Sequence, residues 1–253
     1  MLFLIEFGKV FRRKFNYLFG ILTLLIGIIF TYKLGSLVTY FDISRSNIIF
    51  DFILKIILGL TIFIMGINYI YSYREDYNSR VSTLLEVKKL KTVRDFSAIF
   101  ANVLYFFFYC MVILLGIFSF LFLRERSTFI EIKDVILSEN HIFSYTIFLV
   151  LLLLFSNLIF LLLLTLFNNT NLAISLSLLY FIGGSVIAKM LVNRFSIMAE
   201  RIDNSILTVF DKSFNNLNQF IEFNGSMFIP LVLNIVGLVV VIFIVKFIKK
   251  VIN

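Results

Sequence analysis

Few residues of this chain are of types that could carry out chemistry, and most of them lie in apolar surroundings. Asp51 and Lys55 are spaced i,i+4, so on a helix their opposite charges would share one face and neutralise each other. We expect an interfacial salt bridge there, with an outer gate as the alternative. Cys110 and His141 are the single cysteine and the single histidine. Cys110 therefore has no thiol partner for a disulfide or a zinc site, and we expect no metal site.

The sequence also lacks the motifs of common enzymes. No GxxxxGK[ST] segment occurs, so we expect no P-loop and no ATP site on this chain. No HExxH or GxSxG segment is present, and no glutamate pair lies within an apolar run. The sequence therefore predicts no catalytic residue and no cofactor on this chain.

The composition is that of a membrane protein. Of its 253 residues 60% are hydrophobic and 15% are charged, whereas a soluble domain is roughly half apolar and a quarter charged. The mean hydropathy is +1.01. We expect an all-α membrane protein with one transmembrane domain over residues 1–253. The excess of Phe, Ile, Asn and Lys is typical of an AT-rich genome such as that of a low-GC bacterium, so the membrane we expect is a bacterial cell membrane.

Six apolar blocks are long enough to cross a membrane as helices, since each is near or above the roughly 20 residues required. The predicted spans are about residues 15–32, 48–71, 97–123, 142–167, 172–192 and 227–247. Gly183 and Gly184 allow either a close helix approach or a break in the fifth span. Neutral polar residues within or near spans predict hydrogen bonds between helices or, alternatively, a cavity lining: Asn68, Asn102, Ser156, Asn157, Thr165 and Asn234.

Residues 1–15 are too short and too charged to form a span. Phe7 and the other apolar residues of this segment could share one helix face, with Arg12 and Arg13 near the lipid headgroups. This pattern predicts an N-terminal interfacial helix. A signal peptide has its basic cluster before its apolar part, and here the order is reversed.

The distribution of basic residues predicts the orientation. With both termini on one side, that side holds the larger share of the lysines and arginines found in loops and near span ends. Such a bias marks the cytoplasmic side. We therefore expect both termini and the segment between the second and third spans in the cytoplasm.

That segment, residues 71–96, is the longest charged stretch between two apolar blocks. Val81, Leu84, Leu85 and Lys88 fall at i, i+3, i+4 and i+7, which predicts a short amphipathic helix over about residues 81–90. A helix in this position would offer a docking site for a cytoplasmic partner. The segment 193–226 also has a helical apolar stripe, which predicts one or two amphipathic external helices before the sixth span, with a disordered loop as the alternative: Ile202, Ile206, Val209, Phe210, Phe214, Leu217 and Ile221.

This arrangement resembles the membrane subunit of type-2 ATP-binding-cassette (ABC) exporters. Members of that family often carry a pattern like E-x-x-x-G-T-x-x-x-L-L-x-x-P-x-x-R between their second and third spans. Placed here without gaps, Glu75 takes the glutamate position, Leu84 and Leu85 the leucine pair and Lys91 the basic position. The family's glycine, threonine and proline positions hold other residues in this chain: Ser79, Arg80 and Lys88.

The resemblance implies a coupling helix that docks on a separate ABC ATPase subunit, which would bind ATP and magnesium. It also implies a second permease copy or a related permease, as a homodimer or heterodimer, and no nucleic-acid partner. The residues assigned to the coupling helix on this basis are Glu75, Arg80, Val81, Leu84, Leu85, Lys88 and Lys91.

Small Phe-rich subunits of this family resemble those that export peptides in Gram-positive bacteria. The implied cargo is a short amphipathic peptide toxin of the phenol-soluble modulin type, which suits a cavity lined by Phe, Leu and Ile. One alternative is a permease for immunity or resistance to lantibiotics and other antimicrobial peptides. Another, of a different class, is a structural or regulatory membrane protein whose loop recruits a cytoplasmic partner that is not an ATPase.

Overall fold

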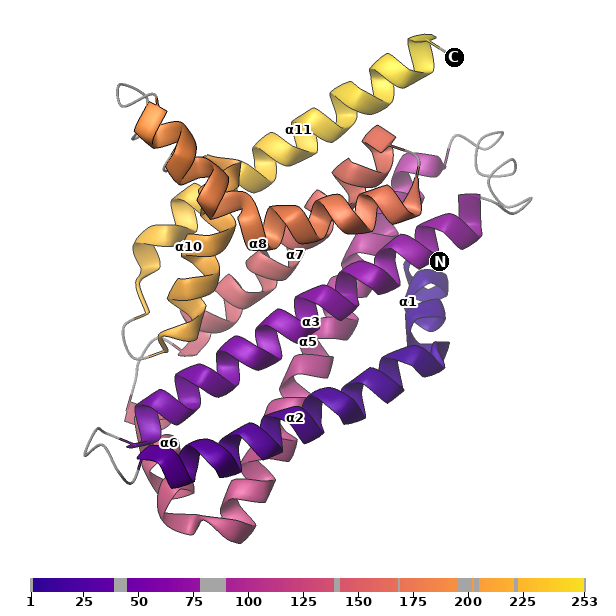
Figure 1. Ribbon diagram of the computed structural model, residues 1–253. Coiled ribbons are helices and arrows are strands. Elements are labelled where there is room, and N and C mark those ends of the chain that lie inside the picture. The colour runs from indigo at the N-terminus through magenta and orange to yellow at the C-terminus, as the bar shows by residue number, and fades with distance from the viewer. Residues whose placement is uncertain are drawn as a thin grey trace.

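The computed structural model describes residues 2–38, 45–77, 90–138, 142–167, 169–194, 202, 205–220 and 223–252. Within these ranges the secondary structure is helical, with no strand. The helices, labelled as in Figure 1, are α1 (Leu2–Arg12), α2 (Lys14–Val38), α3 (Arg45–Tyr77), α5 (Lys91–Arg124), α6 (Arg126–Ser138), α7 (Ile142–Phe167), α8 (Thr170–Arg194), α10 (Ile206–Asn218), the short 3-10 helix η2 (Gly225–Met227) and α11 (Phe228–Ile252).

In the described ranges six helices are long and apolar enough to cross a membrane, namely α2, α3, α5, α7, α8 and α11. The prediction of an all-α chain with six such helices is confirmed. Only helices and closed barrels satisfy all their backbone hydrogen bonds inside a bilayer, which is why apolar blocks of this length become helices. The second and third spanning helices are longer than predicted, because α3 continues to Tyr77 and α5 begins at Lys91. The first and the last also run past their predicted ends, since α2 reaches Val38 and α11 reaches Ile252.

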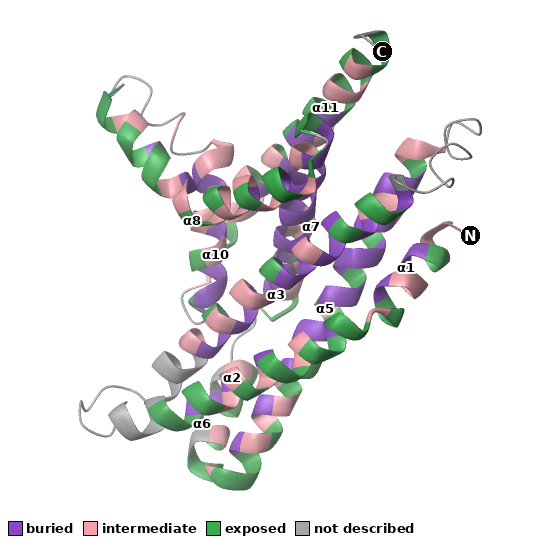
Figure 2. Cartoon of the chain, turned by 45° about the vertical axis from the view of Figure 1, so that its right-hand side comes forward, coloured by how far each residue is buried: buried purple, intermediate pink, exposed green. Residues whose placement is uncertain are grey.

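The spanning helices have two distinct environments. In α3 and α7, 67% of the apolar segment is buried, whereas the figure is 17% in α11, 22% in α2 and α8, and 28% in α5, whose buried residues lie mostly in its first half. α7 is apolar on all sides, as expected of an interior helix, and α3, α5, α8 and α11 pack around it. Figure 2 shows buried residues concentrated in α3, α5 and α7, and exposed residues along α2 and α11. The outer helices thus keep one apolar face uncovered.

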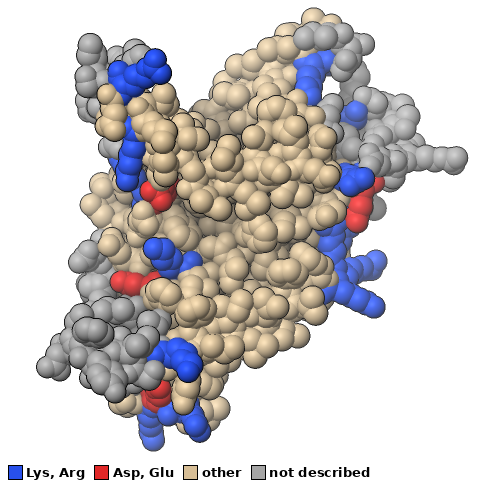
Figure 3. All heavy atoms as spheres, in the orientation of Figure 1, with Lys and Arg blue, Asp and Glu red and all other residues tan. Residues whose placement is uncertain are grey.

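Both termini lie toward the same side of the bundle in Figure 1; the N-terminus is close to the end of α3 and the start of α5, and α11 extends beyond them to the C-terminus. We call this side the terminal end, and the opposite end, where α6 and α10 lie, the far end. Figure 3 shows a broad uncharged band between them, with most basic and acidic groups toward the two ends. This distribution is that of a protein with its apolar middle in lipid.

The chain turns sharply between α1 and α2 at Arg13. The Asn16 side-chain amide donates to the Val10 carbonyl at 2.9 Å, and the Tyr17 hydroxyl donates to the Phe11 carbonyl at 2.7 Å. These bonds satisfy carbonyls that the end of α1 would otherwise leave unpaired. Phe7 lies edge-on to Tyr105 of α5, with ring centroids 6.5 Å apart. α1 is therefore a separate helix held against α5.

α10 lies at the far end, within the segment for which external amphipathic helices were predicted. Ser205 caps its first turn by accepting from the Leu207 N–H. Its apolar face is buried against the bundle, with Phe210 and Phe181 of α8 only 4.5 Å apart between ring centroids. The Tyr145 hydroxyl of α7 donates to the Leu217 carbonyl at 2.7 Å. Packing and hydrogen bonds thus join α10 to both α7 and α8.

The two adjacent glycines of α8 have different surroundings. α8 is continuous through both, so they make no break. A Cβ at Gly184 would lie 2.9 Å from the Leu207 carbonyl oxygen of α10, whereas a Cβ at Gly183 would meet only a Leu179 methyl group at 3.9 Å. Gly184 is therefore the position that lets α8 and α10 approach closely.

We expect Gly184→Ala to lower the free energy of unfolding by about 1–3 kcal/mol, the usual cost of overpacking, because α10 must move away. Gly183→Ala is the matched control and should be neutral or slightly stabilising, since alanine favours helix over glycine. Unfolding in mixed micelles of a mild detergent and dodecyl sulfate measures both. Equal stabilities of the two variants would contradict the close approach.

Candidate functional site

Charged side chains from four helices meet at the terminal end of the bundle. We call this group the charge cluster; its members are Glu6 and Lys9 of α1, Asp76 of α3, Arg94 and Asp95 of α5, and Lys246 of α11. Arg94 and Asp95 are 1% and 0% exposed, so they lie inside the protein rather than at its surface. Ionised groups this deeply buried are rare unless they are paired.

Arg94 occupies the centre of the charge cluster. Its guanidinium donates to the Asp76 carboxylate, to the Asp95 carboxylate at 3.2 Å and to the Ser72 carbonyl at 3.3 Å. A carboxylate oxygen of Glu6 lies 3.8 Å from the Arg94 Nε. The planar, five-donor guanidinium can serve several acceptors at once, which an ammonium on a lysine stem does less well. Arg94 therefore joins α1, α3 and α5 at one point.

Two lysines complete the cluster from either side. The Lys9 ammonium lies 2.8 Å from a Glu6 oxygen and 2.9 Å from both Asp76 oxygens. Lys246 donates to Asp95 at 2.5 Å. Among the described residues the cluster has three bases and three acids, whose formal charges balance. Removing several ions from water is costly, and this balance offsets the cost.

The sequence explains why these groups meet. Ser72 and Asp76 are spaced i,i+4, so on α3 they face the same neighbour. Arg94 and Asp95 are adjacent on α5, so they point in different directions, and they bind different elements: Arg94 binds α1 and α3, whereas Asp95 binds Lys246 of α11. One turn of α5 thereby contacts all three helices through charges.

A line of polar side chains continues from the cluster into the bundle. Arg13 donates to the Asn68 carbonyl at 2.7 Å and to its side-chain oxygen at 3.0 Å. The Asn68 amide donates to Asn102 at 2.8 Å, and the Asn102 amide donates to Asn157 at 2.9 Å. Asn157 in turn donates to the Met65 sulfur at 2.9 Å. These hydrogen bonds join α3, α5 and α7, as predicted for polar residues that bind between helices.

Ser156 and Thr165 donate within their own helix, to the carbonyls of Leu152 and Leu162. Asn234 donates to the Pro230 carbonyl one turn earlier on α11.

The predicted coupling helix lies mostly outside the described residues. This applies to Arg80, Val81, Leu84, Leu85 and Lys88. Of the remaining predicted members, Glu75 binds Arg13 at 2.5 Å, and Lys91 is the first residue of α5. Because Asp76 and Arg94 bind each other, the ends of α3 and α5 that flank residues 78–89 are tied together.

The N-terminal residues predicted to lie at the interface have separate contacts. Phe7 stacks on Phe3, with ring centroids 6.1 Å apart, and lies edge-on to Tyr105. Arg12 is exposed, whereas Arg13 binds α3 as described above. α1 therefore contributes charge to the cluster and aromatic contacts beside it.

Asp51 and Lys55 lie at the far end of α3. An Asp51 carboxylate oxygen accepts the Phe220 N–H just beyond α10, at 3.3 Å. Lys55 instead lines a cleft between α3, α8 and α10. The structure thus gives Asp51 a role in holding the chain after α10.

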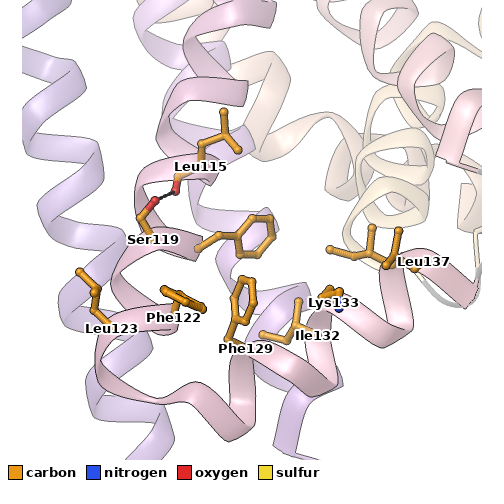
Figure 4. A pocket seen from close by; sticks show the side chains of 10 residues that line it. Leu115, Ser119, Phe122, Leu123, Phe129, Ile132, Lys133 and Leu137 are labelled. Atoms are coloured by element: carbon orange, nitrogen blue, oxygen red, sulfur yellow. Dashed lines mark hydrogen bonds between the residues drawn. The ribbon is translucent and has the colours of Figure 1, made fainter.

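A second cleft, of about 660 Å³, lies between α5 and α6 (Figure 4). The rings of Phe122 and Phe129 meet edge-on across the hairpin, 5.3 Å apart between centroids. Ser119, a polar member of the lining, donates to the Leu115 carbonyl and so offers little to a ligand. This cleft suits hydrocarbon better than a polar molecule.

No group of three or more histidine, cysteine or acidic side chains that could hold a metal ion occurs in the described part of the chain. Cys110 is fully buried among apolar side chains. The charge cluster is therefore the principal candidate site in these ranges, and its geometry suits a structural junction between helices.

Sequence reasoning did not identify the charge cluster. Glu6, Asp76, Arg94 and Asp95 contributed only to the counting of charges at span ends. One signal in the sequence could have indicated the cluster. If the second and third spans are extended toward residues 78–89, the oppositely charged Asp76 and Arg94 come to lie on either side of that segment.

Comparison of this chain with protein-family models, with curated proteins and with solved structures found no match.

We expect Arg94→Met to lower the free energy of unfolding by about 3–5 kcal/mol, because removing one partner of a buried ion group leaves carboxylates uncompensated. Arg74→Met is the matched control, since Arg74 lies on the exposed side of α3, and it should change stability by no more than about 0.5 kcal/mol. Unfolding in mixed micelles measures both. Coincident transitions would show that the cluster does not stabilise the fold.

Proposed function

We propose that this chain is the membrane-spanning subunit of an exporter driven by a separate ATPase, of the type-2 ABC kind. The observation that carries the proposal is the charge cluster. It joins both helices that flank residues 78–89 to the N-terminal helix and to α11. Under the proposal, an ATPase that binds ATP and magnesium docks on residues 78–90.

The charge cluster would transmit movement of such a docking segment to the helices around it. A displacement applied between α3 and α5 would reach α1 through Glu6 and Lys9, and α11 through Lys246. Separating these groups within the protein would leave buried charges unpaired, which costs several kcal/mol per ion. The four helix ends would therefore move as one body rather than slide past one another.

The proposed orientation has the terminal end in the cytoplasm, which the distribution of lysine and arginine favours. The uncovered apolar faces of α2, α8 and α11 support an amphipathic or lipid-like cargo, for which we propose peptides of the phenol-soluble modulin type. A second permease copy or a related permease would cover part of these faces.

The docking proposal is tested by co-purification of the tagged chain from its native membrane, with ATP hydrolysis and mass spectrometry as readouts. We expect a P-loop ATPase to co-purify with the unaltered chain. Leu84→Asp with Leu85→Asp should remove it, because the change places two charges on the proposed apolar face.

The matched control places the same two charges at positions on the opposite side of the predicted helix, as Thr83→Asp with Val87→Asp, and should retain the ATPase. An ATPase retained by the Leu84 and Leu85 variant, or lost equally from both variants, would refute docking through this face.

The cargo proposal is tested by ATP hydrolysis of the reconstituted complex in lipid vesicles. We expect stimulation by a short amphipathic helical peptide. A peptide of the same composition, with its order scrambled to remove the apolar face, should stimulate much less. Equal stimulation by both peptides, or stimulation by lipids alone, would refute a cargo recognised as an amphipathic helix.

A further inference from the structure

A cleft of about 340 Å³ opens between α3, α8 and α10. One end of its lining is polar, with Lys55 of α3 and Asp211 and Asn215 of α10. The rest is apolar apart from Ser177, whose hydroxyl donates to the Ile174 carbonyl of α8, and it extends along α3 as far as Ile70. Figure 3 shows a hollow on this face of the molecule, with blue and red atoms along one edge.

The charges at the polar end are not matched to each other. Lys55 and Asp211 line the same cleft but form no salt bridge, and neither binds another residue of the described chain. Lys55 is exposed and Asp211 is half-buried, so both are accessible to a ligand. An ammonium and a carboxylate held apart at one opening are complementary to a molecule that carries both charges itself.

The length and volume of the cleft favour a hydrocarbon chain over a helical peptide. Lys55 and Ile70 are 15 residues apart on α3, which corresponds to about 22 Å at 1.5 Å per residue. A helical peptide of that length and about 10 Å in diameter would fill on the order of 1,700 Å³. The cleft, of about 340 Å³, is several-fold smaller and open along its side, so a helical peptide would lie mostly outside it, whereas a single hydrocarbon chain could lie along it.

The surroundings of the cleft are also those of a lipid site. Phe63 and Ile182 line it and are 37% and 77% exposed, on helices that are apolar enough to span the membrane. The polar end lies at the far end of the bundle beside α10, where headgroups would be, and the apolar part runs past the middle of the span toward the terminal end. A phospholipid beside these helices would have its headgroup and its chain in this order.

We infer that the cleft binds one phospholipid with a zwitterionic ethanolamine headgroup. Its phosphate lies toward Lys55, its ammonium toward Asp211, and one acyl chain follows the apolar lining between α3 and α8. Charge-assisted hydrogen bonds to both ends of the headgroup distinguish this lipid from one with a single negative charge. The inference does not depend on the proposed function.

The absence of tryptophan from the chain makes a direct test possible. Phe63→Trp places one fluorophore in the cleft, and Phe108→Trp places one on the open face of α5, where Phe108 is 54% exposed. Each variant is reconstituted in phosphatidylglycerol bilayers. Phosphatidylethanolamine or phosphatidylglycerol with brominated acyl chains, which quench tryptophan on contact, is then titrated in.

In the Phe63→Trp protein, half of the quenching should occur at about one-tenth of the mole fraction for brominated phosphatidylethanolamine compared with phosphatidylglycerol, a ratio equivalent to about 1.4 kcal/mol. In the Phe108→Trp protein the two lipids should quench alike, because that side chain faces bulk lipid. Equal quenching at Phe63→Trp, or a preference there for phosphatidylglycerol, would overturn the inference.

The charges are tested in the Phe63→Trp background. Lys55→Gln and Asp211→Asn should each abolish the preference for phosphatidylethanolamine. Lys189→Gln and Asp134→Asn are the controls, since both residues are exposed and lie outside this cleft, and they should leave the preference unchanged. A preference that survives Lys55→Gln and Asp211→Asn would overturn the assignment of the headgroup site.

Discussion

A buried guanidinium must be surrounded by acceptors, and in this chain that requirement fixes where four helices end. Arg94 is 1% exposed and lies where α1, α3 and α5 meet, with Asp95 beside it binding α11. A uniform apolar face specifies only weakly how far one helix extends past another. Paired charges within the protein tolerate little displacement, since each lost partner leaves an ion without compensation. The charge cluster thus fixes the register at the terminal end, as the Asn68–Asn102–Asn157 hydrogen bonds do within the bundle.

Hydropathy predicted the six spanning helices and failed at their ends, for a physical reason. Runs such as that of α7 leave no alternative to a helix in lipid, so its predicted bounds of 142–167 agree with the structure. The second and third spans were predicted to stop at Tyr71 and to begin at Ser97, where charged residues come close. In the structure the helices continue, because Asp76 and Arg94 bind each other instead of water. A hydropathy scale gives a charged residue the same value whether or not it has a partner. Partners far apart in the sequence cannot be identified from one sequence alone.

The proposed lipid site and the proposed cargo call for different surfaces. The cleft between α3, α8 and α10 extends along α3 from Lys55 to Ile70, and its volume of about 340 Å³ is several-fold smaller than that of a helical peptide of the same length. The uncovered faces of α2 and α11 are broad and apolar, and they impose no such limit. α10 forms one wall of the cleft, and its position depends on the close approach of α8 and α10 at Gly184. A lipid in the cleft would add a further contact between α10 and α3.

The position of Lys246 bears on how the protein is assembled. Glu6 and Lys9 are made first, Asp76, Arg94 and Asp95 follow, and Lys246 comes more than a hundred residues later in the last spanning helix. Until that helix is inserted, Asp95 has Arg94 beside it but not the Lys246 ammonium. The last helix therefore adds its ion pair to a junction whose other described members are already in the chain.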